Sequence, residues 1–468
     1  MEHKQKSYYF LGVAGAGTSA LASILISEGC RITGSDEAIF PPVSTYLDRL
    51  GIKYYTDFDA AHIPADTDAA IIGTSAKLHP ETNPEYAEII QRELPHYSFA
   101  EYLGQYTRGR ENMVIAGSFG KSTLTSLITF IMKQAGRDPG YFIGAVPLDL
   151  DRTGDAGSDP LFIMEGDEYI VSNEKRLAKF LFYNPNHVLI SSLIHDHVNV
   201  FPTLEEYEAP FADLIALVPP DGTLVCANQY DALHRLTHGR RVVWYGVDEC
   251  DGYYAEGLQI GETTRFRLVT PEGERIPLET QLLGLHNIEN IIGAAAILLE
   301  RELVTAADLQ AAVPKFRGVA RRLDKKTTTS PIPVYEGFGS SYEKARSAID
   351  AMLLHFPDRN LITVFEPHTF SWRNKDALEW YDSVFDGVGH VLMMPPPTHG
   401  AGSHQQLTQG EIVARVQKAG VSVEAVQSGD EVLKKLAAEL QPKDIVLLLS
   451  SGPLDNLPAT LPAMLDKK

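Results

Sequence analysis

The sequence has little cysteine, no long hydrophobic run and fewer basic than acidic residues. Only three cysteines occur in 468 residues, and Cys30, Cys226 and Cys250 lie too far apart to form a metal-binding or disulfide motif. This excludes a disulfide-stapled secreted domain and favours a reducing compartment. No apolar run approaches the ~18 residues that a membrane-spanning helix needs, so no membrane partner is expected.

The charge balance narrows the possible partners further. Lys and Arg number 41 and Asp and Glu 61, which gives a formal net charge of -20 at pH 7. A nucleic-acid-binding surface needs a basic stripe, so nucleic acid is not expected as a partner. The N-terminal stretch MEHKQKSYYFLGVAG runs straight into an apolar strand, without the apolar core and cleavage site of a signal peptide. The sequence therefore predicts a soluble cytoplasmic protein in which local Lys and Arg offset anionic ligands.

Three α/β segments follow one another along the chain, since 468 residues exceed one ordinary core. Residues 1–107 alternate apolar strands with helices. Residues 108–315 open with a strand and a glycine-rich turn and end near the helix HNIENIIGAAAILLERE, and residues 316–468 hold four further apolar strands. This alternation predicts an α/β fold with doubly wound parallel sheets. The Pro- and Gly-containing joint at 314–318 is the expected hinge.

The most informative stretch is MVIAGSFGKSTLTS, residues 113–126, which reads as a strand, a Gly-x-x-Gly-Lys-Ser-Thr turn and the start of a helix. Glycines permit backbone angles that direct successive N–H groups at an anion, and the helix N-terminus adds its positive end. Lys121 is placed to reach terminal phosphates and the Ser122 hydroxyl to bind Mg²⁺. A purely structural turn is the alternative. The predicted nucleotide-binding residues of this turn are Gly117, Ser118, Phe119, Gly120, Lys121, Ser122 and Thr123.

A second glycine-rich turn, GVAGAGTSALA, follows the first strand and contains Gly12, Gly15 and Gly17. A dinucleotide site is the first interpretation of such a turn. Asp36 comes at the end of the second strand, where its carboxylate is placed to accept hydrogen bonds from a ribose or a base. A capping or loop role for Asp36 is the alternative.

The shortened phosphate turn resembles that of the Mur ligase family, whose pattern is Gly-Thr-Asn/His-Gly-Lys-Thr/Ser-Thr. Members of this family join an amino acid or a peptide to UDP-N-acetylmuramate or its peptides, with ATP and Mg²⁺ and through an acyl phosphate. The resemblance implies a Rossmann-like UDP-sugar-binding domain at 1–107, a central P-loop ATP-binding domain at 108–315 and a Rossmann-like acceptor-binding domain at 316–468. The turn at Gly12, Gly15 and Gly17 would then hold the diphosphate of the UDP-sugar.

Two further stretches carry residues that hold Mg²⁺ in the family. EGDEYIVSNEKRLAKF begins with Glu165, and HDHVNVF contains His197. The resemblance implies that Glu165 and His197 bind a second Mg²⁺ between ATP and the substrate carboxylate. They lie 32 positions apart, and NEKRLAKF is similar to the DKRSKF-type insertion of members that take a murein tripeptide. Members that take L-alanine are the next most similar.

The nucleotide site is completed by two later motifs. LLGLHNIENIIGAAAI is similar to the family's Gly-x-His-Asn-x-x-Asn helix, which puts Asn287 and Asn290 on one helix face, within reach of ATP. FRGVARRLD is similar to the hinge motif in which Arg322 would contact the ATP phosphates when the third domain closes. A helix-capping role for the asparagines and an ion-pair role for Arg322 are the alternatives. The implied catalytic residues are Lys121, Glu165, His197 and Arg322.

Two departures from the family pattern leave alternatives open. Phe119 replaces a hydrogen-bonding residue in the phosphate turn, and its ring is expected to turn away from phosphate and pack on apolar surface. Gly337 occupies the place of an Asp that holds the ATP ribose in the family. The resemblance thus implies an ATP-dependent amide ligase that joins a murein peptide to UDP-N-acetylmuramate. An L-alanine ligase, a divergent ligase for another carboxylate and a non-catalytic nucleotide-binding homologue remain the alternatives.

Overall fold

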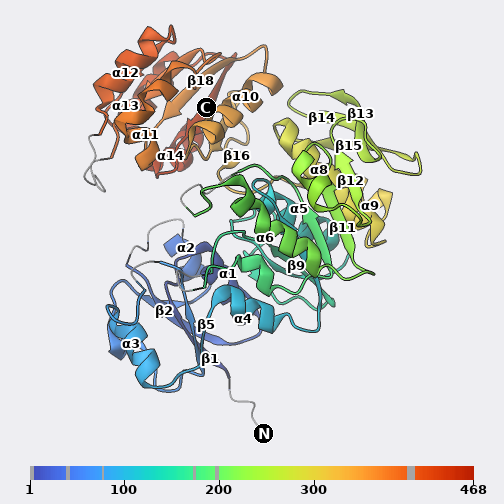
Figure 1. Ribbon diagram of the computed structural model, residues 1–468. Coiled ribbons are helices and arrows are strands. Elements are labelled where there is room, and N and C mark those ends of the chain that lie inside the picture. Colours follow the sequence, from blue (N-terminus) through green and yellow to red (C-terminus); the bar gives the residue numbers. More distant parts are fainter. Residues whose placement is uncertain are drawn as a thin grey trace. The chain divides into compact units, whose positions relative to one another are not determined.

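The computed structural model describes residues 5–37, 39, 43–75, 78–171, 175–195, 200–397 and 406–467. Three sheets with helices on their faces make up the chain (Figure 1). The chain forms two compact units. The first unit comprises Met1–Leu258, Phe266–Glu279 and Ile288–Phe316, and the second comprises Gln259–Arg265, Thr280–Asn287 and Arg317–Lys468. Within the described ranges, no helix combines the length and the apolar character needed to cross a membrane.

The first sheet has the order β3-β2-β1-β4-β5, and all its neighbouring strands are parallel. The strand order reverses between β1 and β4, and ligands of doubly wound sheets bind beyond the carboxyl ends of the strands at such a point. Gly12 follows β1 and Gly73 follows β4, so the first glycine-rich turn lies at this point. The elements of this sheet are β1 (Ser7–Leu11), α1 (Ala16–Ser27), β2 (Arg31–Ser35), α2 (Val43–Arg49), β3 (Lys53–Tyr55), η1 (Ala60–His62), β4 (Ala69–Ile72), α3 (Pro84–Gln91), β5 (His96–Ser98) and α4 (Phe99–Tyr106).

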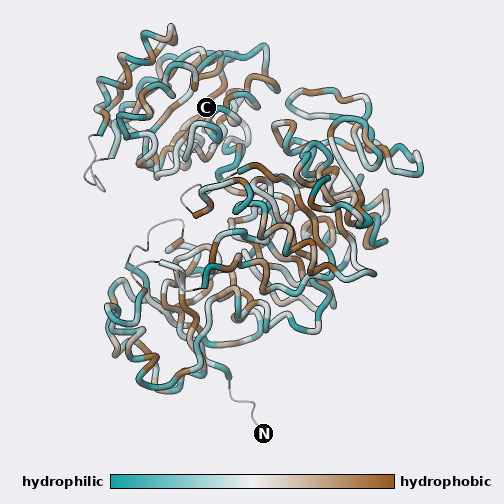
Figure 2. The backbone as a smooth tube through the Cα atoms, in the orientation of Figure 1, coloured by the Kyte–Doolittle hydropathy of each residue, from teal (hydrophilic) through white to brown (hydrophobic). Residues whose placement is uncertain are grey.

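The second sheet has the order β15-β14-β13-β12-β11-β10-β6-β9-β7-β8. Its central strands are almost wholly buried, as parallel strands covered on both faces should be, and Figure 2 shows hydrophobic stretches through the interior of this part. The first elements are β6 (Glu111–Ala116), α5 (Lys121–Gln134), β7 (Gly140–Phe142), β8 (Gly154–Asp155), β9 (Leu161–Glu165), η2 (Lys179–Phe182), β10 (His187–Ile190), α6 (Leu204–Leu217), β11 (Thr223–Ala227), α7 (Asp231–Leu236) and β12 (Val243–Gly246). The later ones are β13 (Gly252–Gln259), β14 (Thr264–Val269), β15 (Arg275–Thr280), α8 (Leu285–Glu300), α9 (Ala306–Ala312) and η3 (Val313–Lys315).

The third sheet has the order β16-β17-β21-β18-β19-β20 and lies in the second unit. β16 pairs antiparallel with β17, and the other neighbours are parallel. Its elements are β16 (Arg322–Lys325), β17 (Val334–Gly337), α10 (Tyr342–His355), β18 (Asn360–Phe365), α11 (Phe370–Arg373), η4 (Lys375–Asp382), β19 (His390–Met393), α12 (Gln409–Lys418), β20 (Val423–Ala425), α13 (Gly429–Glu439), β21 (Asp444–Leu449), η5 (Leu454–Asn456) and α14 (Leu457–Leu465). The predicted α/β fold with parallel sheets is therefore confirmed.

Inside the first unit, elements of the first sheet pack directly on those of the second. The Ser23 hydroxyl of α1 donates to Gly154 O over 2.7 Å, and the hydroxyls of Tyr46 and Thr153 also lie 2.7 Å apart. Gly104 of α4 lies against the carbonyl oxygen of Phe182 so closely that a Cβ atom at 104 would overlap it. These contacts hold the two sheets against each other.

Candidate functional site

A cavity of about 630 Å³ in the first unit joins the two glycine-rich turns. One part of its lining comes from the end of the first sheet, and another part comes from the phosphate turn and the end of β9. The lining residues used below are Gly12, Gly15, Gly17, Asp36, Phe99, Lys121, Phe142, Gly144, Glu165, Asp167 and Lys179. Both predicted ligand sites therefore open into one space.

The phosphate turn is held in place by the segment that follows β10. Phe119 N–H donates to Ser192 Oγ over 2.8 Å, and Ser191 Oγ donates to Phe119 O. Gly117 has a φ of 137° and Gly120, the N-cap of α5, a φ of 84°, backbone angles that favour glycine. The turn thus presents the N-terminus of a buried helix toward the cavity, as an anion-binding turn does.

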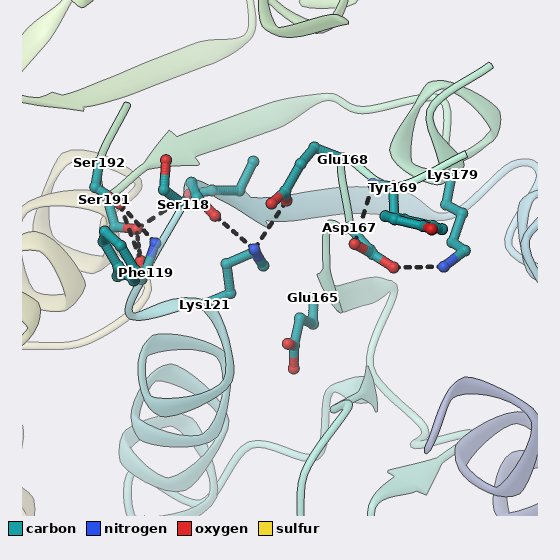
Figure 3. A network of polar contacts seen from close by, with 12 residues as sticks. Ser118, Phe119, Lys121, Glu165, Asp167, Glu168, Tyr169, Lys179, Ser191 and Ser192 are labelled. Carbon is teal, nitrogen blue, oxygen red and sulfur yellow. Dashed lines mark hydrogen bonds and ion pairs between the residues drawn. The ribbon is translucent and has the colours of Figure 1, made fainter. Parts of the chain in front are cut away.

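Lys121 is held by a buried carboxylate. Its Nζ lies 2.8 Å from Glu168 Oε2 and 2.6 Å from Gly117 O, and the Glu168 side chain is 0% exposed (Figure 3). Burial alone lowers the pKa of Lys121, but the carboxylates of Glu168 and Asp167 outweigh it and raise the pKa above its usual value. Lys121 therefore lines the cavity as a cation.

The predicted Mg²⁺ ligands of the turn and of β9 lie side by side. Ser122 Oγ donates to Glu165 Oε1 over 2.8 Å, and Gly144 N–H donates to Glu165 Oε2 over 2.7 Å. A hydroxyl and a carboxylate oxygen at this distance fit Mg²⁺, which prefers oxygen ligands and takes the rest from phosphates and water. No cluster of three His, Cys, Asp or Glu side chains suited to a metal occurs among the described residues. His197, the other predicted ligand, lies outside the described residues.

The turn after β1 begins at the carboxyl end of that strand and leads into α1. Gly12 has a φ of 86°, and its carbonyl accepts a hydrogen bond from Thr18 Oγ1 over 2.7 Å. Asp36 lines the cavity, and its Oδ2 accepts a hydrogen bond from Ala14 N–H over 3.2 Å. This contact, with a residue before the N-cap of α1, supports the loop alternative for Asp36, and its ligand role stays a prediction.

Comparison with known proteins identifies the family. The model of the Mur ligase middle domain matches residues 115–298, and that of the Mur ligase family catalytic domain matches residues 7–111. The chain belongs to the Mur ligase family. It is an ATP-dependent amide ligase, as members of this family are.

Individual relatives cover nearly the whole chain. The UDP-N-acetylmuramate–L-alanine ligase of Desulfitobacterium hafniense is 25% identical, over 95% of this chain and 96% of its own length. The UDP-N-acetylmuramate–L-alanine ligase of Halorhodospira halophila is 28% identical, over 97% of this chain and 92% of its own length. The structure of the Thermotoga maritima UDP-N-acetylmuramate-alanine ligase has a TM-score of 0.80 at 18% identity, covering 99% of this chain and 100% of its own. This confirms the three-domain Mur ligase architecture.

A murein tripeptide ligase is also similar to the chain. The UDP-N-acetylmuramate:L-alanyl-gamma-D-glutamyl-meso-diaminopimelate ligase of Neisseria meningitides is 27% identical, covers 68% of this chain and 100% of its own, and has a TM-score of 0.60. The NEKRLAKF stretch and the 32-position spacing favour the tripeptide members. Because the curated relatives above are L-alanine ligases, that preference is not confirmed.

Of the remaining predicted nucleotide-binding residues of this Mur ligase, Asn290 lies in the first compact unit, and Asn287 and Arg322 lie in the second. Asn290 of α8 lies against the phosphate turn, since a Cβ atom at Gly120 would lie 2.6 Å from Asn290 Oδ1. Asn287 Nδ2 donates to Leu283 O, just before α8, over 2.7 Å, so its contact with ATP stays a prediction. Arg322 begins β16 in the second unit and is exposed, so its contact with ATP stays a prediction.

The two departures from the Mur ligase pattern have structural explanations. Phe119 is 43% exposed, so the expected packing of its ring is wrong; its backbone N–H and C=O are held by serines, and the ring points outward. A Cβ atom at Gly337 would lie 3.1 Å from Leu449 Cδ1 and 3.5 Å from Leu447 Cδ1. A carboxylate at this position would be buried among leucines, at a high cost in free energy, which argues against a ribose-binding Asp at position 337 of this chain.

Three residues of the site were missed. Glu168 holds Lys121, and Asp167 Oδ2 accepts from Lys179 Nζ over 2.6 Å. The signal was present, because EGDE puts acidic residues directly after a buried strand, and NEKRLAKF carries the lysine. Burial alone raises the pKa of Asp167, but Lys179 and Lys121 lower it below its usual value.

The turn allows a prediction about backbone strain. Gly117→Ala should lower the melting temperature and abolish ATP turnover, because a Cβ atom at 117 would overlap Ser191 Oγ and lie 2.9 Å from Ser192 N. Such strain costs on the order of 1–3 kcal/mol. Gly136→Ala is the matched control: it lies at the other end of α5 with a φ of 80°, and no atom lies within 4 Å of its added Cβ. Equal melting temperatures for the two variants would contradict the overlap.

Proposed function

We propose that the chain joins a murein tripeptide to UDP-N-acetylmuramate in peptidoglycan synthesis or recycling. The observation that carries this proposal is the single cavity lined both by the turn after β1 and by Lys121 and Glu165. A UDP-sugar on the first turn could reach ATP on the second without leaving this cavity. The curated relatives act on UDP-N-acetylmuramate by their names, which supports the same donor.

The proposed reaction has two steps, phosphorylation of the donor carboxylate and formation of the amide bond. The donor carboxylate attacks the γ-phosphorus of ATP, which forms an acyl phosphate and releases ADP. The acceptor amine then attacks the acyl carbon, loses a proton and forms the amide, and phosphate leaves. Lys121 and the N-terminus of α5 stabilise the negative charge that gathers during the first step. Ser122 and Glu165 would hold Mg²⁺, which neutralises phosphate charge when bound.

Two acceptors are supported by different observations. The NEKRLAKF stretch and the 32-position spacing from Glu165 to His197 favour the tripeptide. The L-alanine ligases among the relatives, and the similarity of FEPHTFSWRN to the corresponding stretch of those enzymes, favour L-alanine as the second candidate.

A phosphate-release assay separates these candidates. The protein is incubated with ATP, MgCl₂ and UDP-N-acetylmuramate, together with the tripeptide, with L-alanine or with no amine. The products are identified by mass spectrometry. Of the three mixtures, we expect phosphate release and a new amide product only in the one that contains the tripeptide. A product with L-alanine would select the second candidate. No product with either amine would overturn both and favour another carboxylate or a non-catalytic role.

A further inference from the structure

Lys179 is a buried lysine that faces the cavity and has no role in the chemistry described above. It begins η2, its side chain is 9% exposed, and its Nζ lies 5.5 Å from the ring centroid of Phe99 and 5.2 Å from that of Tyr169. Figure 3 shows Lys179 pointing toward Asp167, beside Tyr169. Burying a lysine ammonium group costs free energy unless an anion or other hydrogen-bond acceptor pairs with it.

The ammonium group has capacity for a ligand. It carries three N–H donors, and among the described residues Asp167 Oδ2, at 2.6 Å, is the only hydrogen-bond acceptor for them. The aromatic rings beside it favour a cation but accept no conventional hydrogen bond. A second anion in the cavity would therefore meet two available donors.

The position of Lys179 lies between the two turns. On one side, its aromatic neighbour Phe99 packs against the first turn, since a Cβ atom at Gly17 would lie 2.6 Å from Phe99 Cζ. On the other side, Lys179 pairs with Asp167 over 2.6 Å, and Asp167 comes two residues after Glu165 and lines the same cavity as Lys121. A donor that spans from the first turn to the phosphate turn must pass this lysine.

We propose that Lys179 binds the lactyl carboxylate of UDP-N-acetylmuramate and makes the site specific for a donor that carries this carboxylate. This inference rests on the proposed function. Among the described residues that line the cavity, the only basic ones are Lys121 and Lys179. The acidic ones are Asp36, Glu37, Glu165 and Asp167. Because Lys121 is held at the phosphate turn, Lys179 is the cation left to offset an entering carboxylate.

The test compares two ligands that differ by the lactyl group. Binding of UDP-N-acetylmuramate and of UDP-N-acetylglucosamine is measured by calorimetry for the full chain and for Lys179→Met. We expect Lys179→Met to weaken UDP-N-acetylmuramate binding by about 10- to 100-fold, as loss of a charged hydrogen bond does, and to leave UDP-N-acetylglucosamine binding unchanged. Lys179→Arg should recover part of the affinity. An equal loss for both ligands would overturn the inference.

Two further variants separate ligand binding from a structural role. Lys175→Met is the control, because Lys175 lies four positions earlier, is 58% exposed at its side chain and pairs with Glu101. If Lys179 only neutralised Asp167, the double variant Lys179→Met with Asp167→Asn would regain affinity for UDP-N-acetylmuramate; we expect it to remain weak. This variant also avoids leaving the Asp167 carboxylate, which is 36% exposed, without its ion-pair partner.

The outcome for the wild-type chain distinguishes the two proposals. If the unmodified chain binds neither UDP-sugar, the proposed function fails and the inference fails with it. If it binds UDP-N-acetylmuramate and Lys179→Met binds it equally well, the proposed function stands and the assignment of Lys179 is wrong.

Discussion

Replacement of Lys121 by Ala should abolish ATP-dependent phosphate release, with a fall of at least about 100-fold. The Nζ of Lys121 is fixed 2.8 Å from Glu168 and 2.6 Å from Gly117 O, so it stands at the phosphate turn before ATP arrives. Without it, the charge that develops on the transferred phosphoryl group loses its closest side-chain cation in the described part of the cavity. UDP-sugar binding should be retained, because its diphosphate is expected at the turn after β1.

The control for this prediction lies on the same helix. Lys133 of α5 pairs with Asp138 in a bridge whose side chains are 31% and 49% exposed, and Lys133→Ala should leave phosphate release near its original rate. Because Lys121→Ala leaves a buried carboxylate unpaired, Lys121→Met combined with Glu168→Gln should give the same loss in a better folded protein. Retention of phosphate release in the double variant would refute the role of Lys121.

Glu165→Gln should lower turnover by about 100-fold and raise the Mg²⁺ concentration needed for half-maximal activity. Glu165 accepts hydrogen bonds from Ser122 Oγ and Gly144 N–H, at 2.8 and 2.7 Å, and the amide can keep one of these while losing the charge that Mg²⁺ requires. The fold should therefore persist while the metal affinity drops.

The measurement is a magnesium titration of phosphate release at saturating ATP. Asp138→Asn, which removes a carboxylate from an exposed ion pair on the same unit, should show the original Mg²⁺ dependence. An unchanged magnesium requirement in Glu165→Gln would show that Glu165 is not a metal ligand.

Much of the fold and of the turn could be predicted from local sequence patterns. The expected strand and helix around GSFGKST appear as β6 and α5, and the predicted neighbours Ser122 and Glu165 meet, although 43 positions separate them. Ser122 comes after β6 and Glu165 ends β9, and the carboxyl ends of these neighbouring parallel strands share one edge of the sheet. This is why the pairing could be inferred.

The parts that were missed depend on contacts between distant segments. β14 and β15 alternate buried and exposed residues, as strands with one exposed face do, and were not identified among the polar residues between the more apolar strands. EGDE places acidic residues directly after a buried strand and NEKRLAKF carries a lysine, but neither pattern shows that Glu168 and Lys179 are buried, because burial depends on which distant segments fold over them. The backbone carbonyl of Phe119 is held by two serines after β10, 72 and 73 positions away, and no local pattern in the sequence reveals these contacts.

The close packing of Gly104 on Phe182 and of α1 on Gly154 gives the cavity a length that the enzyme cannot easily adjust. If the proposed UDP-sugar donor binds here, a cavity of fixed length limits the span from the donor's diphosphate to its reacting carboxylate. A donor already extended by one amino acid would carry that carboxylate about 3.5 Å farther on, past the phosphate turn. Selection of the unextended donor would then come from the rigidity of the joint between two sheets, far from any atom that reacts.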